Sequence, residues 1–160
     1  MNLTLVPVAI PEDANVIVGQ SHFIKTVEDL YEIMVTSVPG AAFGLAFNEA
    51  SGPCLVRADG TDDGLRAAAI DAALTIGAGH TFVLFMRNAY PINVLNRVKD
   101  CPEVCRIFCA TANPLQVVVA AADEGRGIVG VIDGASPKGV EQDADREGRI
   151  GFLRKIGYKR

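Results

Sequence analysis

The sequence predicts a single α+β domain over residues 1–160, in which one mixed β-sheet is covered by three to four helices. Two observations carry this prediction. Strand-like segments come in pairs with helical segments between them, and Pro, Gly or polar turn residues separate the segments. Hydrophobic residues make up 49% of the 160 residues, which is typical of an ordered globule. A chain of this length buries roughly 70% of its unfolded surface, so we expect a substantial core.

Two strands are expected near the N-terminus. Residues 2–10 alternate around Pro7, whose missing N–H is typical of an edge strand. Residues 14–18 form a second β-branched run, which follows Pro11. This second strand leads through a short polar turn into the first helix.

That first helix is expected over residues 26–38. Thr26 and Asp29 form an approximate capping box at its start, and Pro39 and Gly40 end it. Its apolar residues recur with the spacing of one helical face: Val27, Leu30, Tyr31, Met34, Val35 and Val38.

The remaining elements follow from the same kinds of pattern. They are a hairpin of strands 43–47 and 54–57 around a polar loop, a helix that opens at Thr61 and runs to Ile76, strand 81–86, helix 91–99, strand 104–110, a hairpin of strands 115–121 and 127–132, and a final helix after the acidic residues 141–145 that ends near Lys155.

The helical segment from Leu65 to Ile76 is rich in alanine and apolar nearly all round. Such a helix is covered on more than one side, either inside the domain or by another subunit. We therefore predict a homo-oligomer.

Charge and hydropathy narrow the function classes. A formal net charge of −4 gives no reason to expect binding to nucleic acid or to a membrane surface. Apolar runs are only strand-sized and no signal-peptide pattern is present, so we expect a cytoplasmic protein. The basic C-terminal residues are interleaved with acidic ones, and this argues against a nucleic-acid site there: Arg146, Arg149, Arg154, Lys155, Lys159 and Arg160.

No metal site is expected. Cys101, Cys105 and Cys109 are spaced four apart, but no CxxC pair occurs. The segment from Val104 to Cys109 has the pattern of a strand, in which Cys105 and Cys109 share a face with Ile107 as small buried residues.

His22 lies at the junction between the second strand and the first helix. Free N–H groups at the helix start and the cation of Lys25 favour an anion such as phosphate at this place. The alternative is a half-buried histidine that packs under a turn. His80 follows a helix C-terminus, where the partial negative charge disfavours phosphate, so we expect it to be structural or to act through another residue.

Polar residues follow several of the predicted strands. If these strands run the same way, their ends gather in one crevice, the usual ligand position in open α/β sheets. The candidate residues there are His22 with Lys25, Asn48 with Glu49 and Ser51, Arg87 with Asn88, Thr111 with Asn113, and Asp133 with Lys138. Their expected ligands are phosphate for Lys25, Arg87 and Lys138, a base edge or sugar for Asn113, and sugar hydroxyls for Glu49 or Asp133.

Longer runs of the chain resemble the adenosine-specific kinase family. These runs are residues 19–26, 43–47, 49–57, 78–80, 91–96, 109–114, 130–134 and 153–159. The resemblance implies a small α/β protein that binds adenosine or AMP and is associated with stable phosphorylation on histidine.

Two hypotheses remain open. In the first, the chain is a phosphotransferase, an adenosine-specific kinase in which His22 accepts a phosphoryl group while Lys25 and the helix start neutralise charge. In the second, it is a non-catalytic sensor or store of adenosine or AMP. No GxxxxGK[ST] loop occurs, so no familiar element grips a triphosphate. No cofactor is assigned, although Mg²⁺ could accompany a phosphate donor.

Overall fold

The computed structural model describes residues 2–160, which form an α+β fold of eight strands and four helices. All the predicted elements are present, and the largest shift is in the strand predicted at residues 54–57. The elements are β1 (Asn2–Val8), β2 (Asn15–Ser21), α1 (Thr26–Ser37), β3 (Ala42–Asn48), β4 (Val56–Gly60), α2 (Asp63–Ile76), β5 (Thr81–Arg87), α3 (Pro91–Lys99), β6 (Val104–Thr111), β7 (Leu115–Ala121), β8 (Arg126–Asp133) and α4 (Asp143–Lys155).

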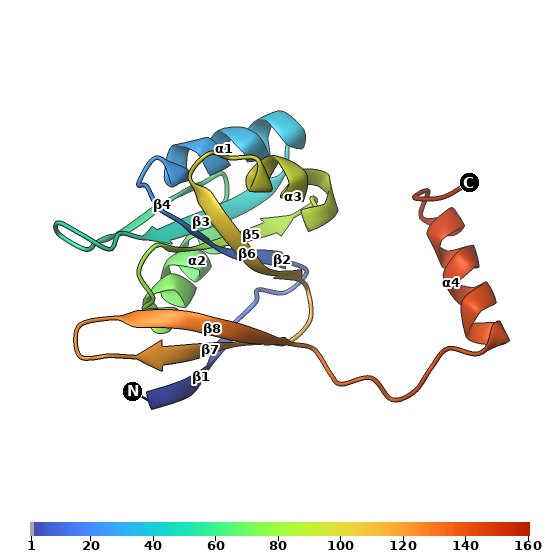
Figure 1. Cartoon of the computed structure of the whole chain (residues 1–160). Helices are drawn as coiled ribbons and strands as arrows, with labels where there is room; N and C mark the ends of the chain where they lie inside the picture. Colours follow the sequence, from blue (N-terminus) through green and yellow to red (C-terminus); the bar gives the residue numbers. More distant parts are fainter. Residues whose placement is uncertain (1) are drawn as a thin grey trace.

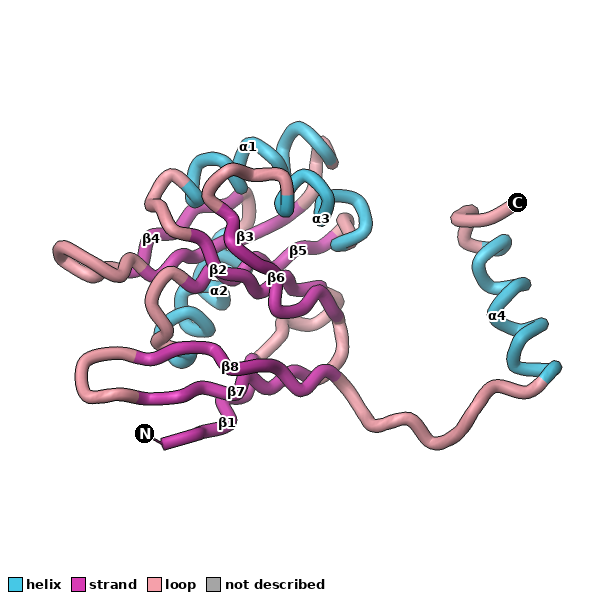
Figure 2. The backbone as a smooth tube through the Cα atoms, in the orientation of Figure 1, coloured by secondary structure: helices cyan, strands magenta, loops and turns pink. Residues whose placement is uncertain are grey.

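The strands divide into two sheets, where the sequence predicted one mixed sheet. A five-stranded sheet has the order β4-β3-β5-β2-β6, and a three-stranded sheet has the order β1-β7-β8 (Figures 1 and 2). Each strand pair recorded among residues 2–160 is antiparallel. The edge position predicted for β1 is confirmed, but its partner is β7, with Leu5 opposite Val118. Tertiary packing selects such a distant partner, and local turn signals do not reveal it.

Three layers bury the core. Helices α1 and α3 cover one face of the five-stranded sheet, over a cluster that includes Phe43, Phe82 and Met86. The opposite face packs against α2 and the three-stranded sheet, where Phe85 and Val117 are among the buried residues. The body is therefore held together by two apolar clusters that share the five-stranded sheet.

Helix α2 is covered inside the body. It contacts β3, β4 and β5, and its buried residues are Leu65, Ala69, Ala72, Ala73 and Ile76. Two apolar residues of α2 are exposed, Ala67 and Leu74, and Leu74 has 60% of its surface exposed. The sequence predicted that this helix is covered either inside the domain or by another subunit, and the structure shows cover inside the domain. Helix α2 therefore does not itself require a second subunit.

Helix α4 stands apart from the body at the end of an extended segment, residues 134–142 (Figure 1). Within the described part of the chain, no residue of α4 is buried. Nor does any helix of residues 2–160 have the length and apolar character needed to cross a membrane.

Candidate functional site

The predicted site residues lie at two opposite ends of the five-stranded sheet, so the single crevice expected from the sequence is wrong. Strand β2 is antiparallel to both β5 and β6, and its first residue, Asn15, pairs with Met86. The residues that follow β5 and β6 therefore lie near the start of β2, whereas His22 follows its end. Strand β2 has seven residues, so its two ends lie about 20 Å apart.

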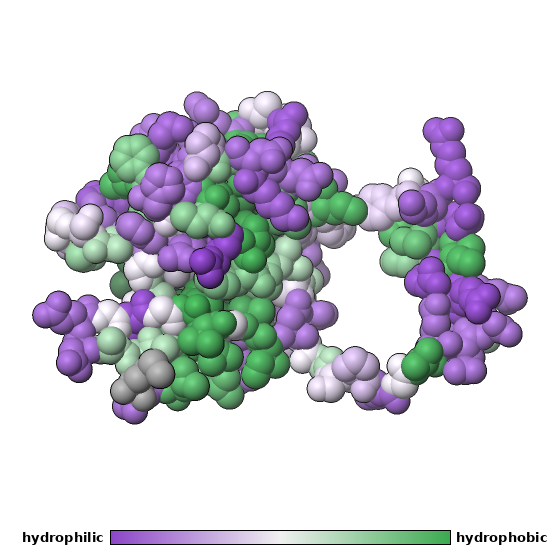
Figure 3. Space-filling model, viewed as in Figure 1, coloured by the Kyte–Doolittle hydropathy of each residue, from purple (hydrophilic) through white to green (hydrophobic). Residues whose placement is uncertain are grey.

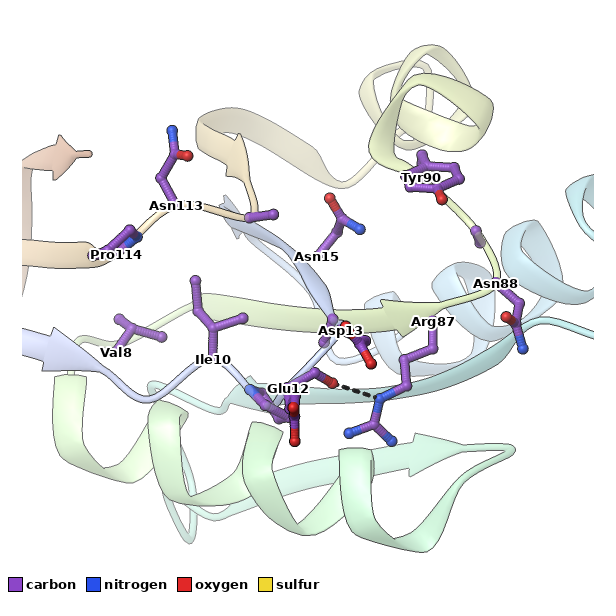
Figure 4. Close-up of a pocket in the computed structure, with 14 residues that line it drawn as sticks. Val8, Ile10, Glu12, Asp13, Asn15, Arg87, Asn88, Tyr90, Asn113 and Pro114 are labelled. Atoms are coloured by element: carbon purple, nitrogen blue, oxygen red, sulfur yellow. Dashed lines mark hydrogen bonds between the residues drawn. The ribbon is translucent and has the colours of Figure 1, made fainter. Parts of the chain in front are cut away.

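One end carries a cavity with a volume of about 1050 Å³ (Figure 4). Three segments line it: the connection from β1 to β2, the residues after β5, and the turn between β6 and β7. Its polar or aromatic residues are Glu12, Asp13, Asn15, Arg87, Asn88, Tyr90 and Asn113. Of these, Arg87, Asn88 and Asn113 were predicted from the sequence. The others were missed, and the polar turn after Pro11 is the signal that could have found Glu12 and Asp13.

Arg87 ties two of these segments together. Its Nε donates a hydrogen bond of 2.9 Å to the backbone oxygen of Glu12, and its two Nη atoms point away from that bond (Figure 4). Asp13 and Asn88 flank this contact with φ values of 58° and 54°, which Asp and Asn adopt more readily than most residues. The cavity wall here is made of two sharp turns joined through one guanidinium.

Asn113 is held in place by a small polar network. Its Nδ2 donates to Asp133 Oδ1 at 3.0 Å, and its backbone N–H donates to Thr111 Oγ1 at 3.0 Å. The Thr111 hydroxyl donates in turn to Asp133 Oδ1 at 2.7 Å. Thr111 and Asp133 therefore position Asn113, whose amide oxygen this network does not use. Lys138 lies outside the cavity wall, on the exposed segment that leads to α4.

Tyr90 forms the part of the wall next to α3. Its backbone N–H donates to Asn93 Oδ1 at 2.8 Å, and Pro91 begins the helix. The residue is 57% exposed, so much of its aromatic surface is open to solvent. The N-terminus of α3, which favours anions, starts directly beside it.

The opposite end of the sheet carries His22 and Lys25, both exposed. The predicted capping box is wrong: Lys25 is the N-cap residue, and the Thr26 hydroxyl donates to Ser21 Oγ at 2.6 Å. The N–H groups expected to be free are also used, because those of Thr26, Val27 and Glu28 donate to the carbonyl groups three residues earlier.

Lys25 is paired with Asp29 through its ammonium group. The hydrogen bond between them lowers the pKa of Asp29 and raises that of Lys25. This exposed cation therefore already has a partner.

His80 lies at the same end as His22. Its carbonyl accepts from Ser21 N–H at 3.0 Å, and its N–H donates to the Asn48 carbonyl at 2.7 Å. Its ring stacks on Phe47 with a centroid distance of 5.8 Å. With a φ of 61°, His80 joins the ends of β2 and β3, which fits the predicted structural role.

Glu49 and Ser51 belong to the loop after β3 and are also remote from the cavity. Glu49 Oε2 accepts from Leu55 N–H and from Arg57 Nη2, each at 3.1 Å. Both bonds lower the pKa of Glu49, and the bond from Leu55 has the larger effect. Ser51 accepts from Cys54 N–H through its carbonyl, so both residues close the loop.

Cys101, Cys105 and Cys109 are four residues apart in the sequence, but the structure does not bring their thiols together. Cys105 is exposed, contrary to the prediction of a buried residue, because β6 is an edge strand of the sheet. Burial raises the pKa of Cys109 to about 11.

Cys101 lies elsewhere, beside Asp29 and Glu103. Its sulfur and one carboxylate oxygen of each acidic residue lie within 4.8 Å of one another. Burial is the largest cause that raises the pKa of this thiol to about 12, and the hydrogen bond with Glu103 is the next largest. The thiol is therefore protonated at neutral pH.

One comparison with known proteins identifies a family for this chain, and another finds a similar solved structure. Residues 6–159 match the sequence model of the family described as adenosine specific kinase. The crystal structure of the PH1918 protein from Pyrococcus horikoshii OT3 is similar to this chain, with 46% identity and a TM-score of 0.95. The match covers 99% of this chain and 98% of that one. None of the curated proteins compared with the chain matches it.

Proposed function

The chain belongs to the adenosine-specific kinase family, and from this membership and the cavity described above we propose that it binds adenosine and AMP in that cavity and phosphorylates adenosine. The observation that carries the proposal is the placement of Arg87 and Tyr90. They come from one short segment and both line the same cavity, so one wall supplies a cation and an aromatic ring.

Each part of AMP has a matching group in the cavity wall. The aromatic ring of Tyr90 offers a surface for stacking of adenine. The amides of Asn15 and Asn113 can pair with the edge of the base, as Asn does with adenine. The carboxylates of Glu12 and Asp13 can accept hydrogen bonds from ribose hydroxyls. Arg87 and the N-terminus of α3 favour the phosphate.

Phosphorylation of adenosine requires an attack by its 5′-oxygen on the phosphorus of a donor. A new O–P bond forms, the bond from phosphorus to the donor's leaving group breaks, and the hydroxyl proton passes to a base. Glu12 or Asp13 can take this proton, because both carboxylates line the cavity. Arg87 stabilises the charge on the transferred group.

We expect adenosine and AMP to bind, and ATP to bind at least about tenfold more weakly, since the sequence has no triphosphate-binding loop. Calorimetric titration of the three ligands measures this preference. Incubation with adenosine and γ-labelled ATP tests turnover, and labelled AMP is the expected product. Tighter binding of ATP than of AMP contradicts the proposal. Binding without labelled AMP favours the sensor or store.

A second part of the proposal is phosphorylation of His22. The imidazole attacks the donor phosphorus, an N–P bond forms as the donor bond breaks, and the ring proton leaves to solvent. The exposed side chain of His22 supports this step, whereas the His80 ring is half-buried against Phe47. Lys25 and His80 are the neighbouring candidates for a catalytic role. Because about 20 Å of strand separates His22 from the cavity, it does not reach adenosine bound in the same copy.

Intact mass measurement should show one extra phosphate on the wild-type chain after incubation with ATP. The phosphate should disappear after mild acid treatment and survive base, because the N–P bond is a phosphoramidate. We expect it on His80→Ala and not on His22→Ala. The reverse pattern, with adenosine binding intact in both variants, would assign the phosphate to His80.

A further inference from the structure

The C-terminal arm, defined as residues 134–160, presents apolar side chains that no other described residue of the same copy covers. Ile150, Phe152, Ile156 and Tyr158 are 39%, 58%, 43% and 49% exposed, respectively. Figure 3 shows apolar side chains of the arm facing the gap between α4 and the body. The arm therefore carries an apolar surface without a partner among residues 2–160 of its own chain.

Helix α4 has little else to stabilise it. It has 13 residues, and helices of that length are marginal in water without tertiary packing. Arg149 bonds both carboxylate oxygens of Glu141, at 3.0 and 2.7 Å, but exposed ion pairs contribute little. The arm needs an apolar partner to remain ordered.

The same extended arm is present in the related crystal structure. The arm makes up about a sixth of the chain, and a TM-score of 0.95 over 99% of its length requires the arm to leave the body in the same direction there. Extension away from the body is thus shared by two chains that differ at more than half of their positions. A partner surface common to both proteins explains this better than an arm that folds back.

The chain itself offers a matching surface. On the three-stranded sheet, Val6 and Val117 point inward and are buried, whereas Leu3 and Leu5 point outward with 62% and 53% exposure. Ile132, opposite Gln116 on the same outward face, is 46% exposed. This outward face contains Leu3, Leu5, Pro7, Gln116, Val118, Ala120, Gly130 and Ile132, none of which is charged. An uncharged sheet face of this kind fits an apolar helix stripe.

We propose that the arm of one copy packs its apolar residues on the outward face of the three-stranded sheet of a second copy. Both surfaces are present on every copy, so exchange of arms covers both without any other partner. The arm leaves the body beside the cavity, since Gly134 N–H donates to the Pro114 carbonyl at 2.9 Å. The second copy consequently lies near the mouth of the cavity, whatever ligand the cavity takes.

Light scattering on the full-length wild type should give a multiple of 16.9 kDa at micromolar concentration. The variant Ile150→Asp/Phe152→Asp should give 16.9 kDa, and so should Leu5→Glu. Leu74→Glu, at an equally exposed apolar position on α2, is the matched control and should keep the wild-type mass. Circular dichroism establishes that each variant retains its sheets.

Mixing Ile150→Asp/Phe152→Asp, the arm variant, with Leu5→Glu, the Leu5 variant, tests whether the arm contacts this sheet face. A general loss of association would leave the mixture monomeric. The arm variant keeps an intact sheet face and the Leu5 variant keeps an intact arm, so the mixture should regain one contact and form a 1:1 species. A monomeric wild type, an arm variant that keeps its mass, or a mixture that stays monomeric would each overturn arm exchange.

Discussion

Gly44→Ala is expected to destabilise the protein by at least about 3 kcal/mol, at the upper end of the cost of overpacking a core. Gly44 lies on β3 where α2 crosses the sheet. A Cβ at this position would lie 2.1 Å from the Arg66 nitrogen and 2.2 Å from the Leu65 carbonyl carbon. Both are backbone atoms, so no side-chain rotation relieves the clash and the helix itself must move.

Urea unfolding of Gly44→Ala and wild type measures this difference. Gly125→Ala is the matched control, because an added Cβ at Gly125, which directly precedes β8, meets nothing within 4 Å. We expect that control to change the free energy of unfolding by less than about 0.5 kcal/mol. Equal effects of the two substitutions would show that α2 is not packed on Gly44 in solution.

Arg87→Met is expected to weaken AMP binding by about 10- to 100-fold, which corresponds to the roughly 1.5–3 kcal/mol of a hydrogen bond to a charged group. Adenosine has no phosphate, so its affinity should change by less than about threefold. Methionine retains much of the length of the arginine stem and removes the charge. Calorimetric titration with both ligands measures the two effects separately.

Two further measurements identify the reason for any loss. Arg87→Lys keeps the positive charge but loses the planar guanidinium, so it should recover part of the AMP affinity. The bond from Arg87 to Glu12 also supports the cavity wall. An equal loss of adenosine and AMP binding in Arg87→Met would mean that Arg87 only holds the wall and does not contact phosphate.

Local patterns in the sequence were sufficient to identify the helices and strands. The apolar stripe of α1 and the proline and glycine that follow it depend only on neighbours along the chain, so their prediction is confirmed, except that Val35 of the stripe is exposed. The hairpins β3–β4 and β7–β8 were also predicted, because turn residues join their strands directly. Pairing of β1 with β7 was not predicted, since over 100 residues separate the partners.

The candidate cavity was only partly predicted. Arg87, Asn88 and Asn113 follow strands and were recognised as polar residues in that position. Their grouping with His22 was wrong, because it required parallel strands and β2 is antiparallel to its neighbours. Tyr90 and Asn15 were missed, since their positions in the sequence carry no distinctive pattern. Their importance comes from the loops that surround them.

The sequence by itself determined the α+β class, the elements and the family, because periodicity, turn chemistry and long shared runs are properties of the chain. Only the tertiary structure decided the strand order, and with it the separation of His22 from Arg87. Strand direction depends on which distant apolar faces pack together, and this is not encoded in any short segment. The same is true of the uncovered arm, because the sequence of α4 shows its apolar residues but not where they lie relative to the body.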